Sequence, residues 1–551
     1  MTTAPHVALA ADRVRARHDA AVCFVPSEIT ALVAEIRRPL RLLLDPSTGR
    51  RGVQRLPVPG DGDSDGSAGD FEAAAGTARV LGVLPATYPE WLGSRRFRAA
   101  HHTRFPYLAG EMSTGIATAE MVRKLADAGL MGLFGAGGLS ERVLREAVEH
   151  LARSLHGRVN WGVNLIHSPN EPAAEARTAR LLVELGVPAV SASAYMDLTP
   201  PLVLCVARGL RTDGAGSVLR PRRVLAKVSR PETAEKFMSP PPAPLLRQLV
   251  AHGELSAEEA ALAARIPVAE DVTVEADSGG HTDNRPLAVM LPALRALRDR
   301  VAGSVRVGAA GGLGTPAAVA AAFALGADYV LTGSVNQAAV ESGMSAAGRG
   351  MLAQADITDT AMAPAADMFE MGVRLQVLRR GTLFARRAAL LYELYQAHES
   401  LEDIPAARRA QLEEQVFRAP LAAVWARTAR FWADRDPAQV ALADRDAKHR
   451  MALVFRWYLG RSSRWAIAGD PDRTADYQIW CGPAMGSFNR WAAGSFLAAL
   501  EHRTVVQIAL NLLEGAAVIT RAHQARTCGL PITSDGFQFA PRRLAESGGA
   551  R

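Results

Sequence analysis

Eight short apolar runs between residues 104 and 333 constrain the fold more than any other feature of the sequence. Each run ends in glycine or a small polar residue, and a segment with helical periodicity follows most of them. Strands joined in this way are parallel, because a parallel pair needs a long crossover. The runs are residues 106–110, 130–135, 159–165, 188–193, 223–228, 272–275, 305–309 and 328–333.

The number of runs favours a closed barrel over an open sheet. Eight strands within about 230 residues is the pattern of a (β/α)8 barrel, whereas doubly wound open sheets usually have fewer strands. Helices are predicted at residues 118–128, 140–155, 171–185 and 315–325, several of them opening on a Ser or Thr cap. We therefore predict the α/β class, with a (β/α)8 TIM barrel and a large C-terminal helical domain.

Composition divides the chain into four parts. Residues 1–95 form an N-terminal region, in which a segment at about 46–76, rich in Gly, Pro, Asp and Ser, predicts a flexible linker. Residues 96–340 hold the barrel, residues 341–525 are expected to be almost wholly helical, and residues 526–551 form a tail. Six of the eight tryptophans lie in the helical part. A packed helical core explains most of them best, and an apolar lining for an acyl pocket is the alternative.

Several classes of protein are disfavoured by composition. Four scattered cysteines without a CxxC spacing argue against a zinc site or a disulfide framework and favour a reducing cytoplasm. No stretch approaches eighteen uninterrupted apolar residues, and the N-terminus lacks the order of a signal peptide, so we expect no membrane span. The net charge of +7 fits an acidic partner. The basic residues are scattered and no nucleic-acid motif accompanies them, so nucleic-acid binding is not expected.

The most reactive stretch follows the sixth apolar run. Glu275 and Asp277 lead into Ser278, two glycines and His281. Glycine lets the backbone approach a ligand closely, and a histidine just beyond a strand end is well placed for proton transfer in a parallel α/β protein. The alternative is a buried structural histidine beside a tight turn. Another pair, His101 and His102, precedes the first strand and is expected at the barrel entrance or surface.

Two turns of small residues follow the last two apolar runs, where barrels often bind phosphate. One turn is residues 308–314, which run into a helix, and the other holds Thr332, Gly333 and Ser334. Neither matches a Rossmann or P-loop pattern, and no GxSxG motif indicates a hydrolase. A phosphate-bearing cofactor beside one histidine indicates flavin or pyridoxal chemistry. Pyridoxal would need a lysine, and Lys227 is the only candidate inside a strand.

Nine motifs together carry a family resemblance. Six lie at the predicted strand ends: residues 109–116 (AGEMSTGI), 134–139 (FGAGGL), 161–165 (WGVNL), 274–283 (VEADSGGHTD), 307–312 (VGAAGG) and 330–337 (VLTGSVNQ). Three more lie in the helical part: residues 367–376 (DMFEMGVRLQ), 452–460 (ALVFRWYLG) and 476–486 (DYQIWCGPAMG). Over roughly residues 80–525 the chain resembles the PfaD-type trans-acting enoyl reductases of polyketide and polyunsaturated fatty acid synthases. These are relatives of the nitronate monooxygenases (2-nitropropane dioxygenases), which lack so long a helical part.

The resemblance implies FMN as the bound cofactor. Its phosphate would lie on the two small-residue turns, at Gly311, Gly312, Gly333 and Ser334 beside Thr332. Its ring would lie near Met112, Asn164, Lys227, Ser278, Gly279 and Gly280. The sequence departs from the typical motif at residues 111–114, which read EMST where AMAN is usual, although Met112 is kept.

The resemblance also implies a reaction and a partner. NADPH, or NADH, would reduce FMN, which would then reduce an enoyl thioester carried on an acyl carrier protein. His281 would take the place of the family's active-site histidine and donate a proton, with solvent as the alternative donor. Carrier proteins are usually acidic, so a basic cluster is a candidate docking face, and a solvated helix face is the alternative. The cluster is Arg374, Arg379, Arg380, Arg386 and Arg387.

Two other functions compete with this one. A nitronate monooxygenase-like flavin oxidase would use the same cofactor with O2, and the long helical part argues against it. A scaffold of little activity would dock onto a synthase, but it would not need the Asp-Ser-Gly-Gly-His stretch or both turns. A homodimer is a further expectation for this class of barrel.

Overall fold

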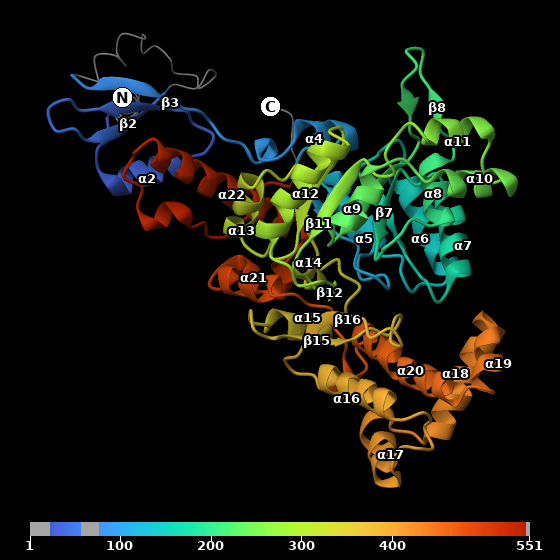
Figure 1. Ribbon diagram of the computed structural model, residues 1–551. Coiled ribbons are helices and arrows are strands. Elements are labelled where there is room, and N and C mark those ends of the chain that lie inside the picture. Colours follow the sequence, from blue (N-terminus) through green and yellow to red (C-terminus); the bar gives the residue numbers. More distant parts are fainter. Residues whose placement is uncertain (1–21, 57–76, 547–551) are drawn as a thin grey trace, which may run out of the picture.

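Eight parallel strands close into a barrel in the computed structural model, which describes residues 22–56 and 77–546 (Figure 1). The chain runs around the barrel in order, and the last strand pairs with the first, with Val330 opposite Tyr107. All eight predicted runs form these strands, so the predicted fold class is confirmed. The strands are β4 (Tyr107–Ala109), β5 (Met131–Phe134), β6 (Trp161–Ile166), β7 (Ala189–Ser193), β10 (Arg223–Val228), β11 (Asp271–Glu275), β13 (Arg306–Ala310) and β14 (Val330–Thr332).

Helices cover the outside of the barrel, each burying an apolar stripe against the strands. In α5, for example, Met121, Val122 and Leu125 are buried, and the Thr118 side chain caps the first turn by accepting a hydrogen bond from the Met121 amide. The helices are α5 (Ala119–Asp127), α6 (Glu141–Ser154), α7 (Pro172–Glu184), α8 (Pro200–Ala207), α9 (Pro231–Met238), α12 (Leu287–Val301) and α13 (Pro316–Ala324). Between α8 and β11 the chain also forms β8 (Arg211–Thr212), β9 (Val218–Leu219), α10 (Ala243–Ala251) and α11 (Ala257–Ala263).

A buried ion network forms the floor of the barrel, at the N-terminal ends of the strands. Asp271, at the start of β11, accepts two hydrogen bonds from Arg306 on β13, at 2.6 and 2.7 Å. The His101 Nε2 atom lies 2.8 Å from the same carboxylate, at the end of α4 (Arg95–His101), and its side chain is fully buried. The expectation that His101 lies at the entrance or surface is therefore wrong, because α4 closes the floor and places this side chain inside.

The described part of the N-terminal region forms one helix and a small antiparallel sheet. It contains α2 (Pro26–Ala34), β1 (Leu40–Leu44), β2 (Arg51–Arg55) and β3 (Arg79–Leu84), in the strand order β2-β1-β3, and the single turn η1 (Pro89–Trp91) leads on to the barrel. The linker prediction at 46–76 is wrong at its start, because residues 51–55 pair with β1. The rest of the predicted linker, residues 57–76, lies outside the described residues.

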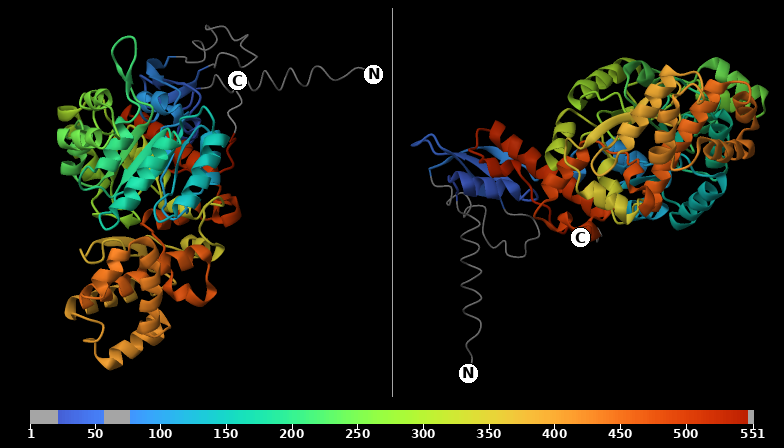
Figure 2. Two further views of the ribbon diagram at one scale, coloured as in Figure 1. Left: turned by 90° about the vertical axis from the view of Figure 1, so that its right-hand side faces the viewer. Right: turned by 90° about the horizontal axis from the view of Figure 1, so that it is seen from below.

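Beyond the mouth of the barrel the chain forms a lobe of helices, seen below the barrel in Figure 2. The prediction of an almost wholly helical stretch is wrong at residues 360–378. There β15 (Thr360–Pro364) and β16 (Arg374–Leu378) form a sheet with the two-residue strand β12 (Gly280–His281). The lobe contains α16 (Phe384–Ala397), α17 (Ala406–Leu412), the π-helical turn η2 (Glu413–Phe417), α18 (Leu421–Arg435), α19 (Pro437–Ala443), α20 (Ala447–Ala468) and η3 (Pro471–Asp476). Between the barrel and α22 lie α14 (Ser334–Gln337), α15 (Ala346–Ala353), α21 (Ala484–Ala492), η4 (Phe496–Ala498) and η5 (Leu500–His502).

The last long helix, α22 (Val505–Thr527), joins the barrel to the N-terminal sheet. It packs against α13 and α2, so the structure does not break at residue 525, and the chain continues in contact through η6 (Ser534–Phe537). α22 is long and apolar enough to cross a membrane, but 94% of its apolar window is buried inside the protein. Burial of this kind is what a core helix shows.

Candidate active site

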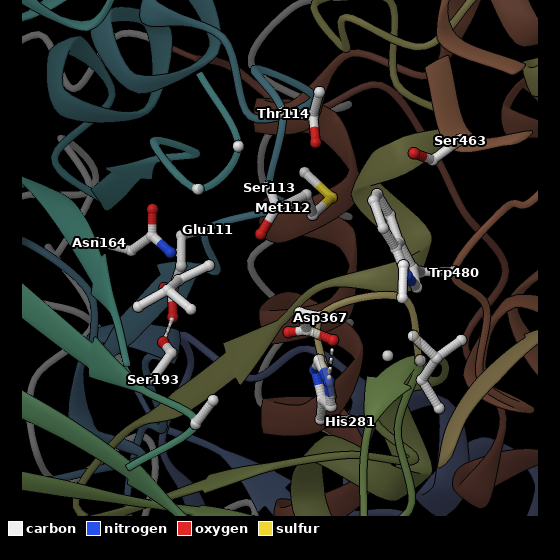
Figure 3. A pocket seen from close by; sticks show the side chains of 18 of the residues that line it. Glu111, Met112, Ser113, Thr114, Asn164, Ser193, His281, Asp367, Ser463 and Trp480 are labelled. Atoms are coloured by element: carbon white, nitrogen blue, oxygen red, sulfur yellow. Dashed lines mark hydrogen bonds and ion pairs between the residues drawn. The ribbon is translucent and has the colours of Figure 1, made fainter. Parts of the chain in front are cut away.

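A cavity of about 780 Å³ opens between the C-terminal ends of the strands and the helical lobe. Residues at or just beyond the ends of all eight barrel strands line it, as ligand sites in this architecture do. Its other wall is built by α18, α20 and the segment around Trp480. Figure 3 shows this division, with Glu111, Asn164 and Ser193 on the barrel side and Ser463 and Trp480 on the lobe side.

Every residue predicted for the site lines this one cavity. Tertiary structure therefore brings together positions spread over more than two hundred residues of sequence, although their individual roles stay predictions. They are Met112, Asn164, Lys227, Ser278, Gly279, Gly280, His281, Gly311, Gly312, Thr332, Gly333 and Ser334.

Lys227 lies between two carboxylates at the barrel mouth. Its Nζ atom is 3.3 Å from Glu111 Oε1 and 3.0 Å from Glu275 Oε1, and its side chain is only 14% exposed. Burial alone would lower the pKa of Lys227, but Glu111 and then Glu275 more than offset this, so its pKa is raised. A lysine held as an ammonium ion is a poor nucleophile, which argues against the pyridoxal alternative.

Glu111, where the sequence departs from the family motif, is part of this cluster. It lies two residues beyond the end of β4, and its buried Oε1 atom accepts hydrogen bonds from Ser191 at 2.9 Å and Ser193 at 2.8 Å. The two hydroxyls come from β7 and fix the carboxylate in place. Its other oxygen, Oε2, is buried and has no hydrogen-bond partner among the described residues.

His281 reaches the cavity because the strand β12 holds it. Gly280 and His281 pair with Gln376 and Leu375 of β16, so the turn after β11 is anchored to the lobe. The His281 Nε2 atom lies 3.4 Å from Asp367 Oδ1, a contact drawn in Figure 3. Burial would lower the pKa of His281, but Asp367 and then Glu275 outweigh it and raise this pKa. The ring is thereby favoured in its protonated form.

The two small-residue turns are adjacent, because β13 and β14 pair directly. Gly311 has a structural reason to be glycine: its φ is +91°, and a Cβ atom would lie 2.7 Å from the Ala276 carbonyl carbon. Gly333 has no such reason, because its φ of −122° suits any residue and a Cβ atom there would meet nothing within 4 Å. Gly312 has a φ of +72°, which favours glycine, but a Cβ atom there would also meet nothing within 4 Å. These two backbones therefore leave an open cradle, which fits the phosphate predicted there.

Two polar side chains in the cavity wall have a hydrogen-bond donor without a partner among the described residues. The Asn164 Oδ1 atom accepts a hydrogen bond of 2.6 Å from the Ala136 amide, which fixes the amide group and directs Nδ2 elsewhere. Within residues 22–56 and 77–546, neither Asn164 Nδ2 nor Ser278 Oγ finds a hydrogen-bond partner, although both are buried. Buried polar atoms normally have partners, so such orphaned donors fit a bound ligand with acceptor atoms, as a flavin ring has.

A second polar cluster in the wall was not foreseen from the sequence. Glu175, on α7, accepts hydrogen bonds from His167 at 3.0 Å, the Ser168 amide at 3.1 Å and Tyr195 at 3.0 Å, and one from Thr199. Burial would raise the pKa of Glu175, but its donors, His167 first, hold it below its usual value. Nothing in the local sequence marks Glu175, which looks like an ordinary first-turn glutamate of an amphipathic helix.

The tryptophans of the lobe divide between the two roles considered for them. Trp432, Trp457 and Trp480 line the cavity, whereas Trp425, Trp465 and Trp491 pack elsewhere in the lobe and beside α22. The first three combine both roles, because Trp432 is itself buried in a core cluster and Trp457 and Trp480 pack against the main core. The residues of α18 and α20 that face the cavity recur at helical spacing, so one face of each helix forms the wall.

Two of the five arginines in the basic cluster predicted as a docking face form ion pairs. Arg387 forms an ion pair with the buried Asp476, and Arg380 forms one with Asp359 at 2.5 Å. The Arg387 contact holds the first turns of α16, and the Arg380 contact holds the loop between β16 and α16. Arg374, Arg379 and Arg386 are exposed. In the part of the chain that the structure describes, no group of three or more His, Cys, Asp or Glu side chains is placed to hold a metal ion.

Comparison with known proteins adds independent information. Residues 398–477 match the family model of the inserted helical domain of [acyl-carrier-protein] S-malonyltransferase, a span that contains α18 and α20. The enoyl reductase domain of MlnA, from the macrolactin biosynthesis cluster of Bacillus amyloliquefaciens, has a similar structure. It has a TM-score of 0.75 and 35% sequence identity, covering 80% of this chain and 99% of that one.

Two curated relatives are larger proteins. One, from a polyunsaturated fatty acid synthase of Thraustochytrium sp., is 43% identical over 505 residues, covering 89% of this chain and 32% of the relative. The polyketide biosynthesis protein PksE of Bacillus subtilis is 43% identical over 436 residues, covering 78% of this chain and 56% of the relative. This chain thus spans between about a third and a little over half of their lengths.

Proposed function

Because the chain belongs to the family of the enoyl reductases of polyketide and polyunsaturated fatty acid synthases, we propose that it reduces the α,β-double bond of an enoyl thioester, with FMN as cofactor and NADPH or NADH as the reductant. An acyl carrier protein would present the thioester. The observation that carries this proposal is the cavity itself, in which the open turns, Lys227 and His281 meet at one barrel mouth.

The residues of the barrel would hold the cofactor. The chemistry that FMN would supply, when bound, is hydride transfer between the reduced nicotinamide and the β-carbon of the thioester. The space left open at Gly312 and Gly333 would hold the phosphate. Asn164 Nδ2 and Ser278 Oγ would donate hydrogen bonds to acceptor atoms of the flavin ring. Lys227, which its two carboxylates keep charged, would supply a positive charge beside the ring.

His281 would supply the proton that the α-carbon of the thioester needs. The carboxylate of Asp367, 3.4 Å from Nε2, favours the imidazolium form before reaction, so the ring holds a proton ready for transfer. β12 fixes the ring at the cavity wall through its pairing with β16. The opposite wall, with Leu453, Trp432 and Trp457, would bury the acyl chain and exclude water.

The direct test follows the acyl chain by mass. FMN-loaded protein is mixed under nitrogen with NADPH and a crotonyl-loaded carrier protein. The proposal expects a gain of about two mass units on the acyl group, as hydride plus proton require, and a strong loss of this gain in His281→Ala with FMN still bound. Flavin reduction without a mass change, followed by rapid reoxidation with a nitronate and air, would instead identify the monooxygenase alternative.

A second test addresses the cofactor site alone. Gly333→Ala adds a methyl group where the fold has open space and an unstrained φ, so the free energy of unfolding should change by less than about 0.5 kcal/mol. The methyl would fill the space proposed for the phosphate, so FMN affinity should fall by about tenfold or more, equivalent to one lost charge-assisted contact. Gly303→Ala, also open but remote from the cavity, is the matched control and should bind FMN normally. Equal FMN affinity in both variants would contradict the phosphate assignment.

A further inference from the structure

Five arginines on α18 and α20 line the lobe side of the cavity, and three of them have no acidic partner among the described residues. Arg435 pairs with Glu171 at 2.5 Å, and Arg456 pairs with Glu370 at 3.0 Å. The remaining three arginine side chains are exposed, and they form no ion pair and no side-chain hydrogen bond with the described part of the chain. These are Arg427, Arg461 and Arg464.

The three arginines share one wall of the cavity. Arg461 and Arg464 are separated by one turn of α20, and Arg427 lies on the cavity face of α18, which packs against α20. Loss of solvation, followed by repulsion from Arg461 and Arg435, lowers the pKa of Arg464. Uncompensated positive charges held at a cavity mouth attract an anion.

The neighbouring side chains narrow the kind of anion. Phe431, one helical turn from Arg427, is 44% exposed and lines the cavity, and the Arg435 guanidinium lies 5.7 Å from its ring centroid. Ser463 adds a hydroxyl on the same wall, as Figure 3 shows. Arginines beside an aromatic ring and a hydroxyl suit a phosphate ester whose attached group is partly apolar, because guanidinium binds phosphate oxygens in pairs.

We propose that Arg427, Arg461 and Arg464 form a phosphate-binding site at the exposed end of the cavity, for a substrate whose reacting end reaches the barrel. This rests on the proposed function, since two of its substrates carry such a phosphate. One is the phosphopantetheine arm of a carrier protein, and the other is the nicotinamide dinucleotide. Either phosphate could be held here with the reacting end of the molecule near His281, because these arginines and His281 line the same cavity.

Binding measurements test the site without turnover. Calorimetry with the FMN-loaded protein compares 4′-phosphopantetheine, pantetheine and 2′,5′-ADP. If the arm supplies the phosphate, 4′-phosphopantetheine binds about tenfold more tightly than pantetheine, and the triple variant Arg427→Gln, Arg461→Gln, Arg464→Gln binds the two alike. If the dinucleotide supplies it, the triple variant loses affinity for 2′,5′-ADP instead. Either result supports the site and identifies the source.

The controls separate the site from general charge effects. Arg430→Gln removes an exposed arginine of α18 that does not line the cavity, and it should leave all three affinities unchanged. In the unmodified protein, added salt should weaken binding of the phosphate probe but not of pantetheine. The proposal is overturned if the triple variant loses less than about twofold for both phosphate probes, or if Arg430→Gln loses as much as the triple variant.

Turnover of a phosphate-free substrate separates this inference from the proposed function. Crotonyl-pantetheine lacks the phosphate, so the unmodified protein should still reduce it if the enzyme is an enoyl reductase. The triple variant should reduce it equally fast if the arm supplies the phosphate, and more slowly at limiting NADPH if the dinucleotide supplies it. If neither protein reduces crotonyl-pantetheine or the carrier-bound thioester, the proposed function fails, while calorimetry still decides whether the arginines bind phosphate. If both reduce it but calorimetry shows no phosphate effect, only the phosphate site is overturned.

Discussion

The interaction between His281 and Asp367 should set the pH dependence of catalysis. The Asp367 carboxylate raises the pKa of His281, so the proton donor stays available to higher pH than an isolated histidine would allow. We expect kcat/KM for the enoyl substrate to fall as pH rises through this raised pKa. Asp367→Asn removes the stabilising charge and should move the fall to lower pH, as a pH–rate profile would show. Asp444→Asn, an exposed control, should leave the profile unchanged, and an unmoved profile in Asp367→Asn would contradict the coupling.

A second residue-level prediction concerns the cluster at Lys227. Glu111→Gln keeps the hydroxyl donors of Ser191 and Ser193 satisfied but removes one of the two charges that stabilise the buried ammonium. We expect a loss of about 1–3 kcal/mol in the free energy of unfolding, because a buried charge loses a partner. Lys227→Met in the Glu111→Gln background should then cost less than Lys227→Met alone. Urea unfolding of the four proteins of this double-mutant cycle measures the coupling, and strict additivity would show that the pair does not interact.

Among the helices and strands, the N-terminal sheet depends on α22. Arg521 is fully buried in α22 and donates hydrogen bonds to the carbonyl oxygens of Glu35, at 2.6 Å, and Arg38, at 2.5 Å, beyond the end of α2. Arg521→Met keeps most of the volume but leaves these bonds unmade, at a cost of about 1.5–3 kcal/mol. Amide exchange in α2 should become faster while exchange in the barrel strands is unchanged. Gln524→Ala, at an exposed position of the same helix, should leave amide exchange in α2 and in the barrel strands unchanged. If exchange in α2 is no faster in Arg521→Met than in the unmodified protein, the dependence of the N-terminal sheet on α22 is contradicted.

For the molecule as a whole, the floor network ties α4, β11 and β13 together. Asp271 is fully buried between His101 and Arg306, and despite burial these partners lower its pKa to about 2. Asp271→Asn leaves Arg306 without its counter-charge and should cost about 3–5 kcal/mol in the free energy of unfolding. The pKa of Asp271 is lower in the folded state than in the unfolded state. The stability that its carboxylate contributes is therefore complete above about pH 4 and declines as pH falls towards 2. Thermal unfolding of both proteins from pH 7 to pH 2 checks this, with the exposed Asp299→Asn as control. A constant difference over that range would exclude the carboxylate as its cause.

Local signals along the chain were enough to predict the barrel, and the family motifs added the candidate residues that line one cavity. Periodicity is a local property, and the eight runs each carry their own strand signal, so the boundaries agree within one or two residues, as at Arg223–Val228. The topology of a parallel barrel then places every strand end at one mouth. That rule, together with the family motifs, is why residues as distant as Met112 and Ser334 could be assigned to a single site from the sequence.

Long-range packing, in contrast, sets how that site is completed and what surrounds it. The strand β12 exists because β16, about a hundred residues later, offers it an edge, and neither segment signals this pairing locally. The burial of His101, the charge balance around Lys227 and the inward turn of Arg387 depend on partners far away in sequence. Which of the tryptophans line the cavity as well as packing in the core has the same origin. Periodicity shows which face of a helix is apolar, but only packing shows whether that face meets another helix or a space that a substrate can enter.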